Sequence, residues 1–117
     1  MKVLVDTSVW IQHFKKQDPY LSELLFNNRV LIHPFVLGEV FIGHVKKRKE
    51  VLELLSYLPK AETLSTEEVL TLITNKSLLG TGLGWIDCHL LASALVEKAD
   101  LYTLDKALQK NFDRIDR

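Results

Sequence analysis

The sequence has a single cysteine, Cys88, so no disulfide bond can form within the chain. It also has no apolar run close to the roughly 18 residues that a membrane-spanning helix requires. The first apolar run ends at Asp6 and is too short for the hydrophobic region of a secretion signal. Because a lone cysteine also fits a reducing compartment, we expect a soluble, cytoplasmic protein.

Net charge is also lacking, since 15 lysines and arginines balance 15 aspartates and glutamates. The overall charge therefore does not indicate a nucleic-acid partner, and RNA binding would need a local basic patch. The sequence shows no internal repeat, linker or low-complexity segment. Its 117 residues are 47% hydrophobic, which is enough for an ordinary core, and we expect a single domain over residues 1–117.

Short apolar strands alternate with helices along the chain. We expect strands at residues 2–6, 30–32 and 101–104, and a further short strand around Ala61. We expect helices at residues 7–14, 19–26, 45–57 and 85–98, and others that begin near Pro34, Ser65 and Asp105. The clearest helix starts are Asp18-Pro19 and the capping box of Ser65 and Glu68. This alternation predicts an α/β sandwich with a mostly parallel sheet, which binds ligands at the carboxyl ends of its strands.

Four acidic residues differ from the others because they accompany apolar segments. Asp6 ends the first strand and Asp105 ends the last one, at the edge of the sheet where ligands bind. Glu39 lies in an apolar helix, with apolar residues one turn away on either side. Asp87 opens a helix that is apolar nearly all round, as buried helices are. We expect the four carboxylates to converge on one pocket.

Each of these residues also has a purely structural interpretation. An aspartate at a helix start caps free N–H groups and favours the helix dipole, which suits Asp6, Asp87 and Asp105. A cation could pair with Glu39, but few basic residues lie in the apolar segments, and a buried carboxylate without a partner is unfavourable. The residue types alone leave capping and ligand binding both open for each aspartate.

A group of carboxylates favours a bound cation. Two carboxylates about 4 Å apart repel each other by about 4 kcal/mol at an effective dielectric near 20, so the group must hold protons at raised pKa values or bind a cation. Oxygen ligands suit Mg²⁺ or Mn²⁺, whereas zinc prefers His and Cys; here Cys88 and His89 face other sides of the helix than Asp87. Such a pocket suggests in-line phosphoryl chemistry, in which the metal activates water.

The sequence has one basic run, which consists of Lys46, Lys47, Arg48 and Lys49. Such a run is usually the solvated face of a helix. It begins seven residues after Glu39, however, so a continuous helix would place Lys46 two turns along on the same face. On that interpretation, the basic run contacts the phosphates of a nucleic-acid strand that approaches the acids.

Two further features carry weaker indications. The loop GTGLG at residues 80–84 resembles a phosphate-binding loop, but it lacks the Gly-Lys-Ser/Thr ending and follows a helix, which favours a flexible connector. The tryptophans Trp10 and Trp85 are more typical of a core or an interface than of platforms on which bases stack.

Taken together, the motifs resemble a known family. The stretch VLVDTSVWI, the helical Glu39 and the segment GWIDCHLLASALVEKADLYTLDKAL, in this order and spacing, resemble PIN-domain ribonucleases over essentially the whole chain. The likeness is strongest to the VapC-type toxins of type II toxin–antitoxin systems. It implies a three-layer α/β/α sandwich around a mostly parallel, about five-stranded sheet.

The resemblance also assigns roles to individual residues. It implies an acidic quartet for Mg²⁺ or Mn²⁺ that consists of Asp6, Glu39, Asp87 and Asp105. Ser8 or Thr7 matches the hydroxyl position that supports the first aspartate. Thr103 matches the small hydroxyl residue two positions before the last acid.

The implied function is that of a metal-dependent endoribonuclease toxin, in which a metal-activated water attacks a backbone phosphate of RNA. Such toxins usually form homodimers, and a cognate antitoxin blocks them by inserting a C-terminal segment toward the acidic pocket. Two alternatives stay open: an RNA-processing PIN nuclease outside a toxin–antitoxin system, and a non-catalytic PIN binding module. A phosphotransfer receiver domain is disfavoured, because Asp6-Thr7 lacks the paired acids that it needs after the first strand.

Overall fold

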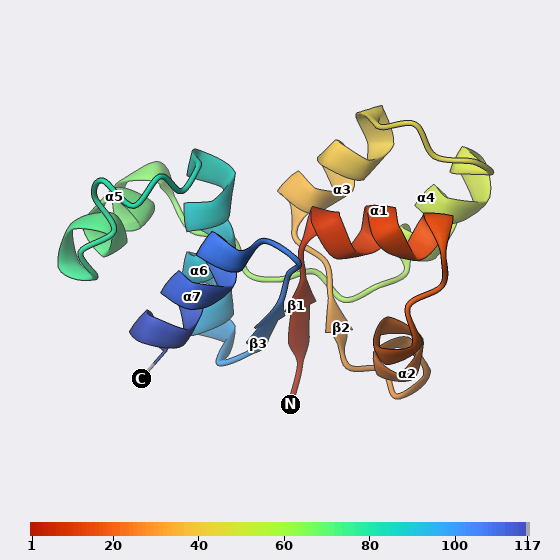
Figure 1. The fold of residues 1–117 in the computed structure, drawn as a ribbon, viewed down its shortest axis with the longest axis horizontal. Helices are drawn as coiled ribbons and strands as arrows, with labels where there is room; N and C mark the ends of the chain where they lie inside the picture. Colours follow the sequence, from red (N-terminus) through yellow and green to blue (C-terminus); the bar gives the residue numbers. More distant parts are fainter. Residues whose placement is uncertain (117) are drawn as a thin grey trace.

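The computed structural model describes residues 1–116, in which short strands alternate with helices (Figure 1). The strands are β1 (Val3–Val5), β2 (Val30–Leu31) and β3 (Asp100–Tyr102). The helices are α1 (Thr7–Lys15), α2 (Pro19–Phe26), α3 (Pro34–Ile42), α4 (Arg48–Ser56), α5 (Thr66–Asn75), α6 (Trp85–Glu97) and α7 (Lys106–Ile115). The predicted α/β class is confirmed.

β1 is the central strand of a parallel sheet with the order β2-β1-β3. Leu4 lies opposite Leu31 of β2 and Leu101 of β3. All three residues of β1 are buried, as expected of a continuously apolar strand in a parallel sheet. The carboxyl end of β1 therefore lies between the ends of β2 and β3, where parallel sheets bind ligands.

The sheet is smaller than the sequence predicts, because three strands rather than about five are found within residues 1–116. The strand expected around Ala61 is reduced to a single bridge between Ile32 and Lys60. The bridge consists of two hydrogen bonds of 2.9 Å, from the N–H of Ile32 to the carbonyl of Pro59 and from the N–H of Ala61 to the carbonyl of Ile32. The pairing ends there because the chain enters α3 at Pro34, directly after its N-cap His33.

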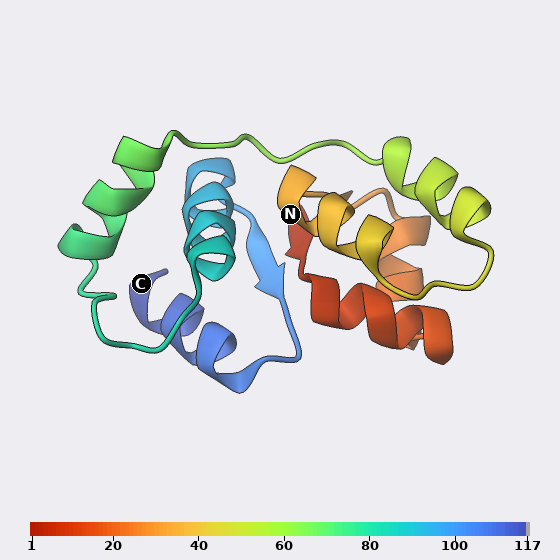
Figure 2. The ribbon, with the colours of Figure 1, turned by 90° about the horizontal axis from the view of Figure 1, so that it is seen from above.

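The helices form layers on both sides of the sheet. Figures 1 and 2 show α1 to α4 on one side and α5 to α7 on the other. The extended chain after α4 runs from the first group to the second, along the upper edge of the molecule in Figure 2. The core lies where both layers meet the sheet, and its largest fully buried side chains include Trp10, Leu4, Leu90 and Leu91. None of the helices within residues 1–116 is both long enough and apolar enough to cross a membrane.

The two apolar helices are buried to very different extents. Every residue of α6 from Cys88 to Ala94 is buried. In α3 only Val36 and Val40 are buried, while the side chain of Ile42 is 80% exposed. The expectation that all four acids lie on core-facing segments is therefore wrong for Glu39, because the apolar stripe around it reaches the surface.

Candidate metal centre

Asp6 lies at the carboxyl end of the central strand, and its carboxylate accepts three hydrogen bonds. One oxygen accepts from the backbone N–H of Thr7 at 2.7 Å, which makes Asp6 the N-cap of α1. The other accepts from the hydroxyls of Ser8 at 2.9 Å and Thr103 at 2.7 Å. The side chain is buried. Asp6 thus caps a helix and also presents a fixed carboxylate at the end of β1.

Two hydroxyl residues after Asp6 have separate partners. The Ser8 hydroxyl donates to Asp6, whereas the Thr7 hydroxyl donates to Oε1 of Glu39 at 2.7 Å. The sequence offered either residue as the support of Asp6, and it gave no sign of the bond to Glu39, which joins residues 32 positions apart. The start of α1 therefore connects the acid at the end of β1 with the acid on α3.

Asp105 is placed differently from the prediction. β3 ends at Tyr102, and Asp105 is the exposed N-cap of α7, where its side chain accepts from the backbone N–H of Leu108 at 3.0 Å. The expectation that Asp105 ends a strand is wrong by three residues. Thr103 nevertheless ties Asp105 to the centre, because its hydroxyl donates to Asp6 and accepts from the backbone N–H of Asp105 at 3.0 Å.

Asp87 lies in the first turn of α6, where its side chain accepts from the backbone N–H of Gly84 at 3.2 Å. Desolvation by burial raises its pKa, and the negative charges of Asp6, Asp105 and Glu39 raise it further. The hydrogen bond from Gly84 acts in the opposite direction, because it favours the ionised carboxylate. Asp6, Asp105 and Glu39 thus lie close enough to Asp87 for their charges to disfavour its ionised form.

The carboxylates suit a hard divalent cation by their chemistry. Oxygen atoms of Glu39, Asp87 and Asp105 stay free of the hydrogen bonds described above, and such all-oxygen sets favour Mg²⁺ or Mn²⁺. Within residues 1–116, however, no three acidic, histidine or cysteine side chains stand close enough to hold one ion together. Mutual repulsion favours this separation, and side-chain rotation is needed to bring the oxygens onto a common ion.

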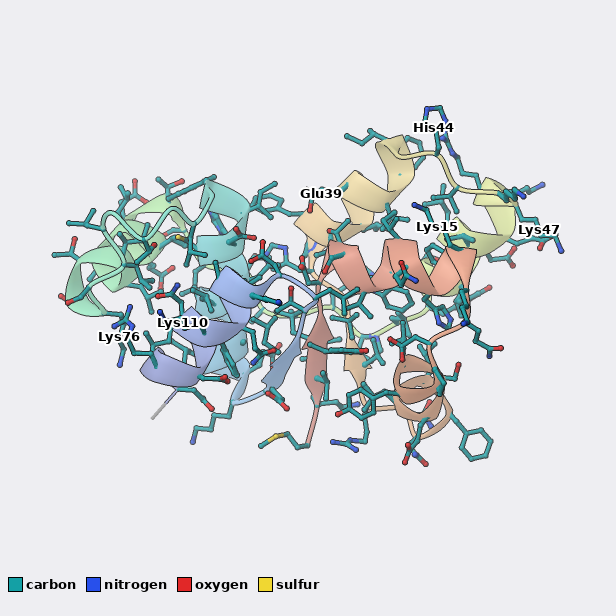
Figure 3. The ribbon with its side chains drawn as sticks, in the orientation of Figure 1. Lys15, Glu39, His44, Lys47, Lys76 and Lys110 are labelled. Atoms are coloured by element: carbon teal, nitrogen blue, oxygen red, sulfur yellow. The ribbon has the colours of Figure 1, made fainter. Side chains whose placement is uncertain are left out.

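The basic run does not continue from the helix that bears Glu39. α3 ends at Ile42 and α4 begins at Arg48, so Lys46 and Lys47 lie in the connection between them, with Lys47 in the left-handed conformation (φ 54°). The expectation that Lys46 shares a helix face with Glu39 is therefore wrong. Figure 3 shows Lys47 at the far end of the α3–α4 unit from Glu39.

Comparison with known proteins identifies the chain. A parallel sheet with carboxylates such as Asp6 at the carboxyl ends of its strands is typical of α/β proteins that bind divalent cations there. The sequence profile described as PIN domain matches residues 3–116. The chain is also 44% identical over 108 residues to "Ribonuclease VapC32" of Mycobacterium tuberculosis strains CDC 1551 / Oshkosh and ATCC 25618 / H37Rv, across 92% of this chain and 87% of that protein. The chain therefore belongs to the PIN-domain family as a VapC-type member, which confirms the resemblance of its motifs.

Proposed function

We propose that this protein is a metal-dependent endoribonuclease and the toxin of a VapBC-type toxin–antitoxin pair. The observation that carries the proposal is the 44% identity to a ribonuclease over 92% of this chain. The hydrogen bonds through Thr7 and Thr103, which link Asp6 to Glu39 and to the backbone of Asp105, support it. PIN-domain ribonucleases generally depend on a divalent metal. We infer Mg²⁺ as the ion, with Mn²⁺ as its substitute, because both prefer oxygen ligands.

The proposed centre divides its work among the four acids. A bound divalent ion would supply a Lewis acid for the attacking water and the scissile phosphate. Asp6 would hold the ion, with its orientation fixed by the hydroxyls of Ser8 and Thr103. A cation beside Asp87 would favour its ionised form, against the burial and the negative charges that raise its pKa in the ion-free protein.

We further propose that the exposed basic run, Lys46 to Lys49, contacts RNA phosphates away from the cleaved bond. Lys46 lies on a cavity of about 350 Å³ that Lys15 and His44 also line, so three basic side chains gather there. Arg48 is fixed in place, because its guanidinium donates to the carbonyl of Gly43 at 2.6 Å. Phosphate contacts of this kind make binding weaken as salt increases.

The name of the similar ribonuclease supports the remaining parts of the proposal. A VapC-type protein is the toxin partner of a VapB antitoxin, which we propose as the inhibitor of this chain. We also propose that residues 1–117 form one domain, that the protein is a homodimer, and that it acts in the cytoplasm, where its RNA substrate is present.

Replacement of Asp6 by Asn tests the nuclease. The variant should lose at least about a hundredfold of RNA cleavage with Mg²⁺, since even the residues that only orient a metal ligand contribute that much. Products of the wild type should carry 5′-phosphates, and excess EDTA should stop cleavage. The matched control is Asp113→Asn, which changes an exposed aspartate of α7 that lies outside the quartet. Undiminished cleavage by Asp6→Asn, or by the wild type in EDTA, contradicts the proposal.

The toxin role has a separate test. Expression of the wild type should arrest growth, the Asp6→Asn variant should not, and co-expression of a small antitoxin encoded beside this gene should restore growth. RNA cleavage without growth arrest would instead indicate an RNA-processing nuclease. Calorimetric titration that shows no binding of Mn²⁺ would indicate a non-catalytic binding module.

A further inference from the structure

Two exposed aromatic side chains stand on the helices that carry Glu39 and Asp87. Phe35 of α3 is 40% exposed and Trp85 of α6 is 42% exposed. Both pack against the ring of His89, which is buried: the ring centroids lie 4.9 Å apart for Phe35 and 4.6 Å apart for Trp85. Both contacts are edge-to-face, with interplanar angles of 73° and 86°. The two rings are thus held in place while a large part of each stays open to solvent.

A buried support lies beneath these rings. His33 is the N-cap of α3, and its Nδ1 accepts from the backbone N–H of Phe35 at 3.0 Å. Its ring lies 4.9 Å from that of Phe35 and 6.3 Å from that of His89. Since His33 is fully buried, Phe35 rests on a fixed base and has few alternative positions. A surface ordered in advance loses less entropy when a ligand binds.

The aromatic pair lies next to the acids. Phe35 precedes Glu39 by four residues, so both project from the same face of α3, one turn apart. Trp85 lies two residues before Asp87 in the first turn of α6, on the helix face that also carries His89. The contact between the rings of Phe35 and His89 joins α3 to α6, the two helices that carry Glu39 and Asp87. Figure 3 shows Glu39 on the part of α3 nearest α6.

We propose that Phe35 and Trp85 form a stacking platform for an unpaired RNA base beside the cleaved phosphate. The inference rests on the proposed nuclease function and adds a substrate contact to it. An RNA strand whose phosphate reaches the carboxylates brings its neighbouring bases to the helices that bear these acids, and exposed aromatic faces bind unpaired bases by stacking.

The two tryptophans of the chain differ in a way that supports this assignment. Trp10 is fully buried and stacks on Phe14 inside the core, which is the role expected of both from the sequence. Trp85 contacts the ring of His89 edge to face and keeps 42% of its surface exposed. Core packing therefore accounts for Trp10 but leaves part of Trp85 accessible to a ligand.

Binding of short RNA probes tests the platform. The probes are an adenosine pentanucleotide and an abasic ribose-phosphate pentamer with the same backbone charge, both with Ca²⁺ in place of Mg²⁺ to prevent cleavage. The wild type should bind the adenosine probe at least about fivefold more tightly than the abasic one, as stacking of one base predicts. Trp85→Leu, which keeps only the ring of Phe35, should lose most of this difference, and Trp85→Phe should keep most of it. Equal binding of the two probes by the wild type overturns the proposal.

Tryptophan fluorescence gives a second readout. The adenosine probe should quench the wild type, but not Trp85→Phe, in which the buried Trp10 is the remaining tryptophan. The matched control is Tyr57→Leu, which removes an aromatic ring that is 79% exposed and lies beside Asn28 and Val30, at the amino end of β2. This variant should bind both probes like the wild type. Selectivity lost to the same degree in Tyr57→Leu and Trp85→Leu would contradict a platform at Trp85.

Failure of the platform and failure of the nuclease are distinguishable. If the wild type cleaves RNA but binds the two probes equally, the proposed platform is wrong and the proposed nuclease function stands. If the wild type binds the adenosine probe more tightly but does not cleave RNA in Mg²⁺, the platform stands as an RNA-binding surface and the proposed nuclease function is wrong.

Discussion

Helices α3 and α6 are both largely apolar, and each carries one acid of the candidate centre, yet the fold treats them in opposite ways. α6 lies against β1 and β3 and buries seven consecutive residues, from Cys88 to Ala94. α3 packs on α1 through Val36 and Val40 and exposes Phe35, Phe41 and Ile42. One apolar helix forms the core, and the other leaves an apolar surface beside the acids.

The difference shows that apolar composition has two uses in this chain. In α6 it stabilises the fold, and burial near the other acids raises the pKa of Asp87. In α3 the exposed rings and Ile42 contribute nothing comparable to the core, and clustered exposed apolar residues mark contact surfaces. The following substitutions test this division, from the largest expected effect to the smallest.

Leucine-to-alanine substitution in α6 should have the largest effect. Leu91 is fully buried in the main core, so Leu91→Ala should lower the free energy of unfolding by about 2–5 kcal/mol. Ile42→Ala in α3 should change it by less than about 0.5 kcal/mol, because that side chain is 80% exposed. Urea unfolding measures both. A loss from Ile42→Ala that matches the loss from Leu91→Ala would show that the outer face of α3 is covered in solution.

The pH dependence of stability should reveal the buried cap of α3. Burial and, to a smaller extent, the charge of His89 lower the pKa of His33 from 6.5 to about 4. The folded state therefore favours neutral His33, and stability should fall as the pH decreases from 6.5 to about 4, by about 3 kcal/mol. His33→Asn keeps a capping side chain without this titration, so its stability should decline less over the same range. If urea unfolding shows that the wild type and His33→Asn lose the same free energy of unfolding over this pH range, the prediction is contradicted.

Glycine-to-alanine substitution in α3 should have the smallest effect, and in the opposite direction. Gly38 is exposed, and a Cβ there would meet nothing within 4 Å, so Gly38→Ala should raise the free energy of unfolding by about 0.5–1 kcal/mol. The control is Gly80→Ala, where a Cβ also meets open space but φ is +72°. That change should destabilise the protein, because alanine is strained in this conformation. Thermal unfolding distinguishes the two signs.

Local signals in the sequence predicted the element boundaries well. Asp18 caps α2 ahead of Pro19, and Ser65 and Glu68 form the predicted capping box of α5. These features involve residues a few positions apart, so the sequence contains everything that determines them. The order of the strands and helices that bear the four acids also follows from the sequence, and the family resemblance rests on that order.

Features that depend on distant partners could not be predicted in this way. The bond between Thr7 and Glu39 crosses 32 positions, and the exposure of α3 depends on what the rest of the fold leaves uncovered. The position of Lys46 was mispredicted because Gly43 ends α3 before the basic run begins. The strand near Ala61 is reduced to one bridge because its partner chain enters α3 at Pro34, two residues after Ile32.

The bond between Thr103 and Asp6 sets an order in time. Its two ends are 97 residues apart, and a ribosome adding about 5–20 residues per second needs roughly 5–20 s to pass from one to the other. During that interval β1 has no β3 beside it, and the first aspartate lacks the hydroxyl that turns it toward the pocket. A growing chain therefore carries an unfinished centre, and the four acids assemble only after the segment with Thr103 has left the ribosome.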